Sequence, residues 1–131
     1  TVDVTQYASA NVNVSGGGGV DLSALMDKTI TELIVPEGAT KIGQHALYIC
    51  SALEIVDLPS TLTSIDDYAF YKCSGLVSLT CRAVTPPTLS RYGFRDAGYK
   101  FDIFVPIESV DTYKGAANWS AFASHIQAIQ E

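Results

Sequence analysis

Residues Leu53–Leu76, LEIVDLPSTLTSIDDYAFYKCSGL, repeat the preceding segment Ile30–Leu53, ITELIVPEGATKIGQHALYICSAL, at an offset of 23 residues. The positions identical across this offset are Pro36/Pro59, Thr40/Thr63, Ile42/Ile65, Ala46/Ala69, Tyr48/Tyr71, Cys50/Cys73, Ser51/Ser74 and Leu53/Leu76. A fixed period of this length is typical of a solenoid, in which each repeat buries its apolar face by stacking on its neighbours. The period therefore predicts a repeat architecture.

Each repeat opens with residues that alternate between apolar and polar, as expected of a half-buried strand. The apolar sets are Leu33 and Val35, Val56 and Leu58, Leu79 and Cys81, and finally Ile103 and Val105. Pro36, Pro59 and Pro106 follow the strands, where a residue without an N–H ends the pairing. The sequence thus predicts four stacked strands.

The third repeat departs from the pattern after Cys81, because Arg82 replaces the proline and Pro86-Pro87 follows. Extended backbone is expected before each proline. The stretch Leu89–Lys100, rich in aromatic residues and arginine, is therefore predicted to form an irregular or enlarged rung.

The two ends of the chain lack the period. Residues 1–29 are predicted to form an N-terminal β cap or a degenerate first repeat, with Val12 and Val14 in its strand. Trp119, Phe122 and Ile126 recur at spacings of three and four, which favours an amphipathic helix. Residues 107–131 are therefore predicted to form a C-terminal helical cap, leaving the repeats at 30–106, and the whole is an α+β solenoid.

Composition narrows the class of partner. The chain carries 8 basic and 14 acidic residues, a net charge of −6, without the basic clusters that nucleic acid or anionic lipid requires. No apolar run is long enough to span a bilayer, so we expect no membrane insertion. The chain begins at Thr1 without an initiator Met, and we expect a processed product whose export signal has been removed.

Cys50, Cys73 and Cys81 are the cysteines of the chain. Cys50 and Cys73 occupy the same position in successive repeats, so their side chains point the same way instead of toward each other. We therefore expect buried free thiols that pack as small apolar groups, although a disulfide lies within the range of strand spacings. No Cys or His spacing indicates a metal site, and we expect no cofactor.

The assembled residues resemble the BspA-like, treponemal-type leucine-rich repeat. Leu58-Pro59 at the strand end, Ile65-Asp66 at the turn, Ala69-Phe70 and Cys73 match the family's unit in register, and Ile30–Leu53 matches with Leu47 in place of Phe. The resemblance implies a short, right-handed leucine-rich-repeat superhelix from a secreted or cell-surface bacterial protein. It also implies adhesion to protein partners on a host or on other bacteria.

Outward-pointing strand residues are the first candidate binding surface, because stacked strands gather them on one sheet face. By register they are Glu32, Ile34, Ile55, Asp57, Ser78, Thr80, Asp102 and Phe104. Three of them, Ile34, Ile55 and Phe104, are apolar without a core position, which favours contact with a partner. Isolated apolar residues are nevertheless ordinary on surfaces.

The irregular rung supplies a second candidate surface, in which Arg91, Tyr92, Arg95 and Tyr99 combine aromatic and planar cationic groups. Such mixtures favour protein or glycan contacts, whereas an insertion that only patches a packing defect is the alternative.

Enzyme chemistry finds little support in the sequence. Asp66-Asp67 fit a turn in which aspartate bonds its own backbone, and His45 and His125 lack neighbours at ligand spacing. We therefore predict a non-enzymatic module of an exported or surface protein that binds a protein partner through its strand face. The alternative is a structural spacer or fragment of a larger surface protein without binding of its own; glycan-binding or hydrolytic activity is less favoured.

Overall fold

The computed structural model of the chain describes residues 2–3, 19–20, 32–35, 37–43, 47, 51–97 and 100–130. The strands are β1 (Val2–Asp3), β2 (Gly19–Val20), β3 (Glu32–Ile34), β4 (Lys41–Ile42), β5 (Ile55–Leu58), β6 (Ser64–Ile65), β7 (Ser78–Cys81), β8 (Thr88–Leu89), β9 (Asp102–Val105) and β10 (Ile126–Ala128). The helical segments are η3 (Ile107–Ser109), α1 (Val110–Gly115) and η4 (Ser120–His125).

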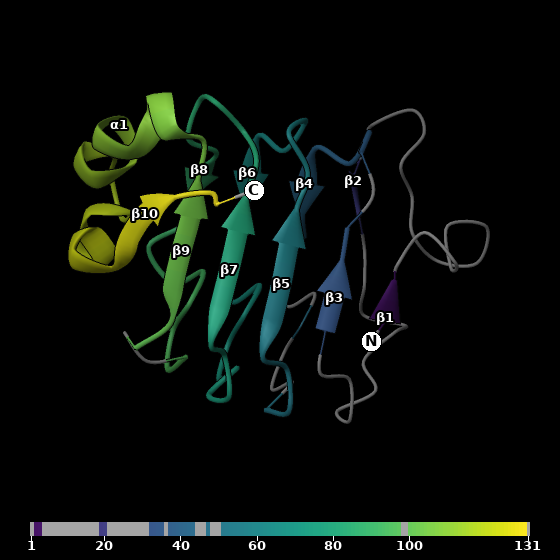
Figure 1. The fold of residues 1–131 in the computed structure, drawn as a ribbon. Helices are drawn as coiled ribbons and strands as arrows, with labels where there is room; N and C mark the ends of the chain where they lie inside the picture. The colour runs from purple at the N-terminus through teal and green to yellow at the C-terminus, as the bar shows by residue number, and fades with distance from the viewer. Residues whose placement is uncertain are drawn as a thin grey trace.

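Two parallel sheets form the two walls of the solenoid. The long sheet has the order β1-β3-β5-β7-β9-β10 and the short sheet the order β2-β4-β6-β8. Figure 1 shows the long sheet in the foreground, with β4, β6 and β8 behind it and the helical segments at the C-terminal end. From β1 to β9 the strands thus alternate along the chain between the long and the short sheet, and β10 then follows β9 in the long sheet.

The register of the long sheet sets equivalent repeat positions side by side. Glu32 pairs with Ile55 and Ile55 pairs with Ser78, each 23 residues apart, and Ser78 pairs with Asp102, 24 residues apart. Residues at equivalent positions of successive repeats therefore lie next to each other, as the repeat requires.

The space between the sheets is filled by the residues that the alternation directs inward. The long sheet contributes Leu33, Val56, Leu58, Leu79, Cys81, Ile103 and Val105; the short sheet contributes Ile42, Ile65 and Leu89; and Leu47, Phe70 and Phe94 lie in the following turns. All are buried, which confirms the predicted inward direction of the strand residues. The rings of Phe70 and Phe94 stack with centroids 5.0 Å apart.

The predicted irregular rung is more regular than the sequence indicates. Backbone N–H groups of Tyr68, Phe70 and Lys72 donate to the carbonyls of Tyr92, Gly93 and Arg95 at 3.1, 2.8 and 2.9 Å. Leu58 pairs with Cys81 at an offset of 23, but Ser64 pairs with Thr88 at 24. One added residue in segment 82–87 thus accounts for the break, and residues 88–97 resume the stack.

At the N-terminal end the long sheet continues with β1, whose Val2 pairs with Leu33, and the short sheet continues with β2, whose Val20 pairs with Ile42. The strand next to β3 is therefore Val2–Asp3, not the segment of Val12 and Val14 that the sequence analysis chose. Val12 and Val14 lie outside the described residues. That residues 1–29 form an N-terminal cap or a degenerate first repeat stays a prediction.

The C-terminal segment differs from the helical cap that the sequence predicts. Helical residues end at His125, and Ile126 begins β10, which pairs in parallel with β9. Phe122, with φ −107° and ψ 15°, interrupts the helical geometry of η4. The unpaired edge of β9 explains the difference, because its backbone groups gain partners from a strand that a helix cannot supply.

Polar side chains of this segment close the end of the short sheet. Four of them donate to backbone carbonyls of segment 83–89: Tyr113 to Ala83 at 2.5 Å, Ser109 to Val84 at 2.7 Å, Trp119 to Pro87 at 2.8 Å and Asn118 to Leu89 at 2.7 Å. Buried carbonyls at a sheet end need such partners. The segment thus satisfies backbone groups as well as covering the apolar core.

Cys73 and Cys81 are buried free thiols, as predicted, and Cys50 lies outside the described residues. The Tyr113 hydroxyl lies 3.3 Å from Cys81 Sγ. Burial raises the pKa of the Cys81 thiol above its ordinary value of 9.0, and it raises the pKa of the Tyr113 hydroxyl above 10.0. Both groups are thus held neutral in the folded protein.

Phe70→Ala should lower the free energy of unfolding by about 3–5 kcal/mol, because it removes a fully buried ring and leaves a cavity against Phe94. Urea unfolding followed by circular dichroism measures this change. Val77→Ala is the control, since Val77 is 57% exposed and should cost less than about 1 kcal/mol. Equal losses in the two variants would contradict the assigned core.

Alkaline pH should destabilise the fold through Cys81 and Tyr113. The unfolded chain releases these protons at lower pH than the folded protein, so their contribution is complete below pH 9.0 and is lost as the pH rises past 9.0 and then 10.0. The variant Cys81→Ala/Tyr113→Phe should show a flatter decline in unfolding free energy across this range. Parallel declines in the variant and the original chain, measured by urea unfolding, would refute the assignment.

Candidate binding surfaces

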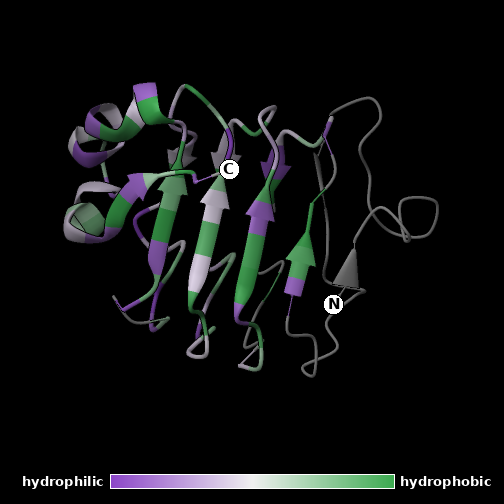
Figure 2. Cartoon of the chain, in the orientation of Figure 1, coloured by the Kyte–Doolittle hydropathy of each residue, from purple (hydrophilic) through white to green (hydrophobic). Residues whose placement is uncertain are grey.

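The outward residues predicted from the strand alternation form two rows on the long sheet. One row is Glu32, Ile55, Ser78 and Asp102, and the other is Ile34, Asp57, Thr80 and Phe104. All eight are at least partly exposed, between buried neighbours. Figure 2 shows the resulting mixture of apolar and polar residues along these strands. We call this surface the strand face.

The three apolar residues of the strand face, Ile34, Ile55 and Phe104, remain at least partly accessible. Ile55 is 42% exposed, and Phe104 is half-buried, whereas Ile103 and Val105 on either side of Phe104 are buried completely. The stack therefore does not need Ile55 or Phe104 for its core. Their contact area is available to a partner.

Arg82 joins the strand face from the end of β7, a contribution that the sequence analysis missed. Its Nε lies 2.8 Å from Asp57 Oδ1, and its second terminal nitrogen lies 3.0 Å from Asp57 Oδ2. This two-point geometry is the strong form of an arginine–carboxylate pair. The Asp57 carboxylate is thus already engaged. The sequence signal was Arg82 at the repeat position of Pro59.

A groove of about 380 Å³ crosses the C-terminal part of the strand face. Its walls are Ser78, Thr80, Arg82, Phe104, Ile129 and Gln130. Ile129 reaches this position because its N–H donates to the carbonyl of Val105 at 2.8 Å, continuing the pairing of β10 with β9. Ile129 and Gln130 were missed because the sequence assigned them to a helical cap.

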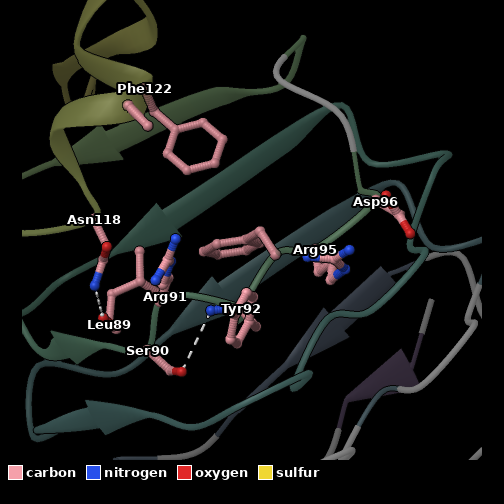
Figure 3. Close-up of a pocket in the computed structure, with 10 residues that line it drawn as sticks. Leu89, Ser90, Arg91, Tyr92, Arg95, Asp96, Asn118 and Phe122 are labelled. Atoms are coloured by element: carbon pink, nitrogen blue, oxygen red, sulfur yellow. Dashed lines mark hydrogen bonds between the residues drawn. The ribbon is translucent and has the colours of Figure 1, made fainter.

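The second predicted surface is also assembled by the fold. Arg91, Tyr92 and Arg95 line a cleft of about 670 Å³, which we call the arginine cleft. The two guanidinium carbons lie 5.5 and 5.4 Å from the centre of the Tyr92 ring, and Figure 3 shows them on either side of it. Tyr99, the fourth predicted residue, lies outside the described residues.

Residues distant in the sequence complete the arginine cleft. Asn118 and Phe122 reach it from the C-terminal segment, and Ser90 and Asp96 belong to the same rung as the arginines. Leu89, Phe94 and Phe122 contribute apolar surface. Neither Asn118 nor Phe122 was predicted to lie here, because contacts between the last rung and the C-terminal segment depend on the tertiary fold.

Carboxylates that could support catalysis have structural partners. Asp66 lies 3.1 Å from Lys41 Nζ, and Asp67 accepts a hydrogen bond from Ser90. His125 Nδ1 lies 3.4 Å from Asp102 Oδ1, and His45 lies outside the described residues. Over the described ranges, no group of three or more His, Cys, Asp or Glu side chains could hold a metal ion.

A family model for the BspA type leucine-rich repeat region matches residues 20–114 in six copies. The chain belongs to the BspA-type leucine-rich repeat family. The match begins well before Ile30, where the sequence analysis started its repeats. Membership suggests a protein-interaction module of a bacterial surface protein, and the family is generally non-enzymatic. A comparison with curated proteins gave no match.

No helix within the described part of this BspA-type repeat domain is long and apolar enough to cross a membrane.

The Asp57–Arg82 pair should contribute measurably to stability, although both side chains are about one third exposed (30% and 38%). A double-mutant cycle with Asp57→Ala and Arg82→Ala should give a coupling free energy of about 1 kcal/mol or less, decreasing with added salt. The single-contact pair Lys41–Asp66 is the matched control and should couple more weakly. A larger coupling for Lys41–Asp66 would contradict the two-point geometry.

Proposed function

We propose that this domain belongs to an exported or cell-surface protein and binds a protein partner through the strand face, without catalytic activity. The observation that carries the proposal is the register of the long sheet, which leaves Ile55 exposed and Phe104 half-buried although the core does not use them. Family membership supports an interaction role. Parallel strands in register also give a rigid surface, which lowers the entropic cost of binding.

The groove beside Phe104 supports the same assignment. Binding energy in protein interfaces concentrates in a few aromatic and arginine side chains that fill pockets and are surrounded by polar groups. Phe104 and Arg82 both line this groove, together with the hydroxyl residues Ser78 and Thr80. Ile55 extends the apolar contact to the neighbouring strand β5. The face thus combines an aromatic centre with hydrogen-bonding groups around it.

The alternative is a structural spacer within a larger surface protein. A spacer predicts no saturable binding of the isolated domain to any partner. The two functions therefore differ in whether the isolated domain binds a partner saturably, and one binding experiment separates them.

Phe104→Asp combined with Ile55→Asp should weaken binding at least about tenfold, because a charge placed at the centre of an apolar contact must lose its hydration. Biolayer interferometry measures this with the domain as analyte against immobilised host matrix proteins and intact bacterial cells. Both substitutions lie outside the core, on the outward side of the long sheet, so circular dichroism should show an unchanged fold.

Ile107→Asp is the matched control, since Ile107 is 78% exposed and lies in η3, away from the strand face. It should change the affinity less than about twofold. Equal loss in the control and the strand-face variant would exclude this face as the binding site. Absence of saturable binding of the original domain across the panel would favour the spacer.

A further inference from the structure

We infer that the arginine cleft binds a carboxylate-bearing saccharide. The first observation is the state of its two cations. The chain has a net charge of −6, yet Arg91 and Arg95 both line one cleft, and neither forms an ion pair with any described residue. Both side chains are exposed. A planar guanidinium without a carboxylate partner presents its donors to an incoming anion.

The tyrosine between the arginines holds them in place. Tyr92 stacks on Tyr68 with ring centroids 5.7 Å apart and planes 9° apart, and its N–H donates to Ser90 Oγ at 3.4 Å. Ser90 in turn donates to Asp67. Since each guanidinium lies about 5.5 Å from this fixed ring, cation–π attraction restricts both side chains. The site is therefore partly organised before a ligand arrives.

The rest of the cleft matches a sugar better than a peptide. Leu89, Phe94 and Phe122 form the apolar floor of the cleft, although each is at most 7% exposed, and the exposed Ala121 beside them adds apolar surface that the C–H face of a sugar ring can contact. The Asn118 amide nitrogen donates to the carbonyl of Leu89, which leaves the amide oxygen to accept from a hydroxyl. A volume of about 670 Å³ suits a small ligand.

Asp96 narrows the ligand class further. Its carboxylate lines the cleft beyond Arg95, as Figure 3 shows. A carboxylate accepts hydrogen bonds from sugar hydroxyls, but it repels a second anionic group. The cleft therefore favours a single carboxylate among hydroxyl groups over a run of acidic residues, and uronic acids and sialic acids both have this chemistry.

This site is separate from the strand face. It adjoins β8 of the short sheet and the C-terminal segment, whereas the strand face belongs to the long sheet. Phe104→Asp should therefore leave saccharide binding unchanged, and loss of one activity need not accompany loss of the other.

Isothermal titration calorimetry of the intact chain tests the inference with methyl galacturonoside and 3′-sialyllactose, each of which carries one carboxylate, as probes. The methyl ester of each acid is its neutral control. At least one acid should bind saturably with a Kd of about 1 mM or below, and its neutral control should bind at least about tenfold more weakly.

Arg91→Gln combined with Arg95→Gln should weaken binding of that acid at least about tenfold, because the charge-assisted hydrogen bonds are lost. Arg91→Lys combined with Arg95→Lys should give an intermediate loss, since charge remains without the planar fork. Lys72→Gln is the matched control, because it removes an exposed cation in the neighbouring rung that does not line the cleft. Its affinity for the acid should stay within about twofold of that of the original chain. Thermal unfolding of each variant checks the fold.

Three results would overturn the inference. One is that neither acid binds saturably. Another is that the ester binds the original chain as tightly as its acid does, or that the glutamine variant binds the acid as tightly as the original chain does. The third is that a glutamate-rich peptide binds more tightly than both acids and depends on Arg91 and Arg95, which would assign the cleft to acidic peptides.

Discussion

Hydrogen bonds between the backbones of successive rungs are the constraint on which the rest of this solenoid depends. Leu47 donates to Ala69, and Phe70 donates to Gly93, at 2.8 Å in both cases. A buried backbone group in one rung can therefore be satisfied only if the next rung keeps the same step. This requirement keeps Leu47, Phe70 and Phe94 in one column, and it confines the single added residue to the segment between Cys81 and Thr88.

The same constraint explains why the groove beside Phe104 and the arginine cleft both lie near the C-terminal end. Stacking must stop somewhere, and the two sheets stop differently: the long sheet gains β10, while carbonyls at the end of the short sheet receive side-chain donors such as Trp119 and Asn118. The first solution brings Ile129 to the groove beside Phe104. The second brings Asn118 into the arginine cleft. Both ligand-sized hollows thus arise from closing the stack.

The sequence predicts whatever depends on periodicity. Alternation and the 23-residue offset identified the outward rows and the buried residues between them, because these follow from repeat register. The grouping of Arg91 with Tyr92 and Arg95 followed from their nearness in the sequence. Features that depend on tertiary pairing escaped prediction. Trp119, Phe122 and Ile126 have helical spacing, yet the unpaired edge of β9 draws Ile126 into a strand. The Arg82–Asp57 pair joins residues 25 positions apart, and its one signal, Arg82 at the repeat position of Pro59, does not indicate the partner.

The two surfaces differ in charge, and this difference separates what each can bind. In the middle of the strand face Arg82 neutralises Asp57, with Ile55 on β5 and Phe104 on β9 to either side of this pair. The carboxylates of Glu32 and Asp102 lie on the outer strands β3 and β9. A neutral apolar centre suits a protein interface, whose core is depleted of charge. The arginine cleft instead concentrates two cations around one aromatic ring in an acidic chain. The charges of Arg91 and Arg95 attract an anion to the arginine cleft, whereas the strand face offers no comparable attraction. The two proposed ligands, a protein partner and an acidic saccharide, would therefore bind to one small domain without competing.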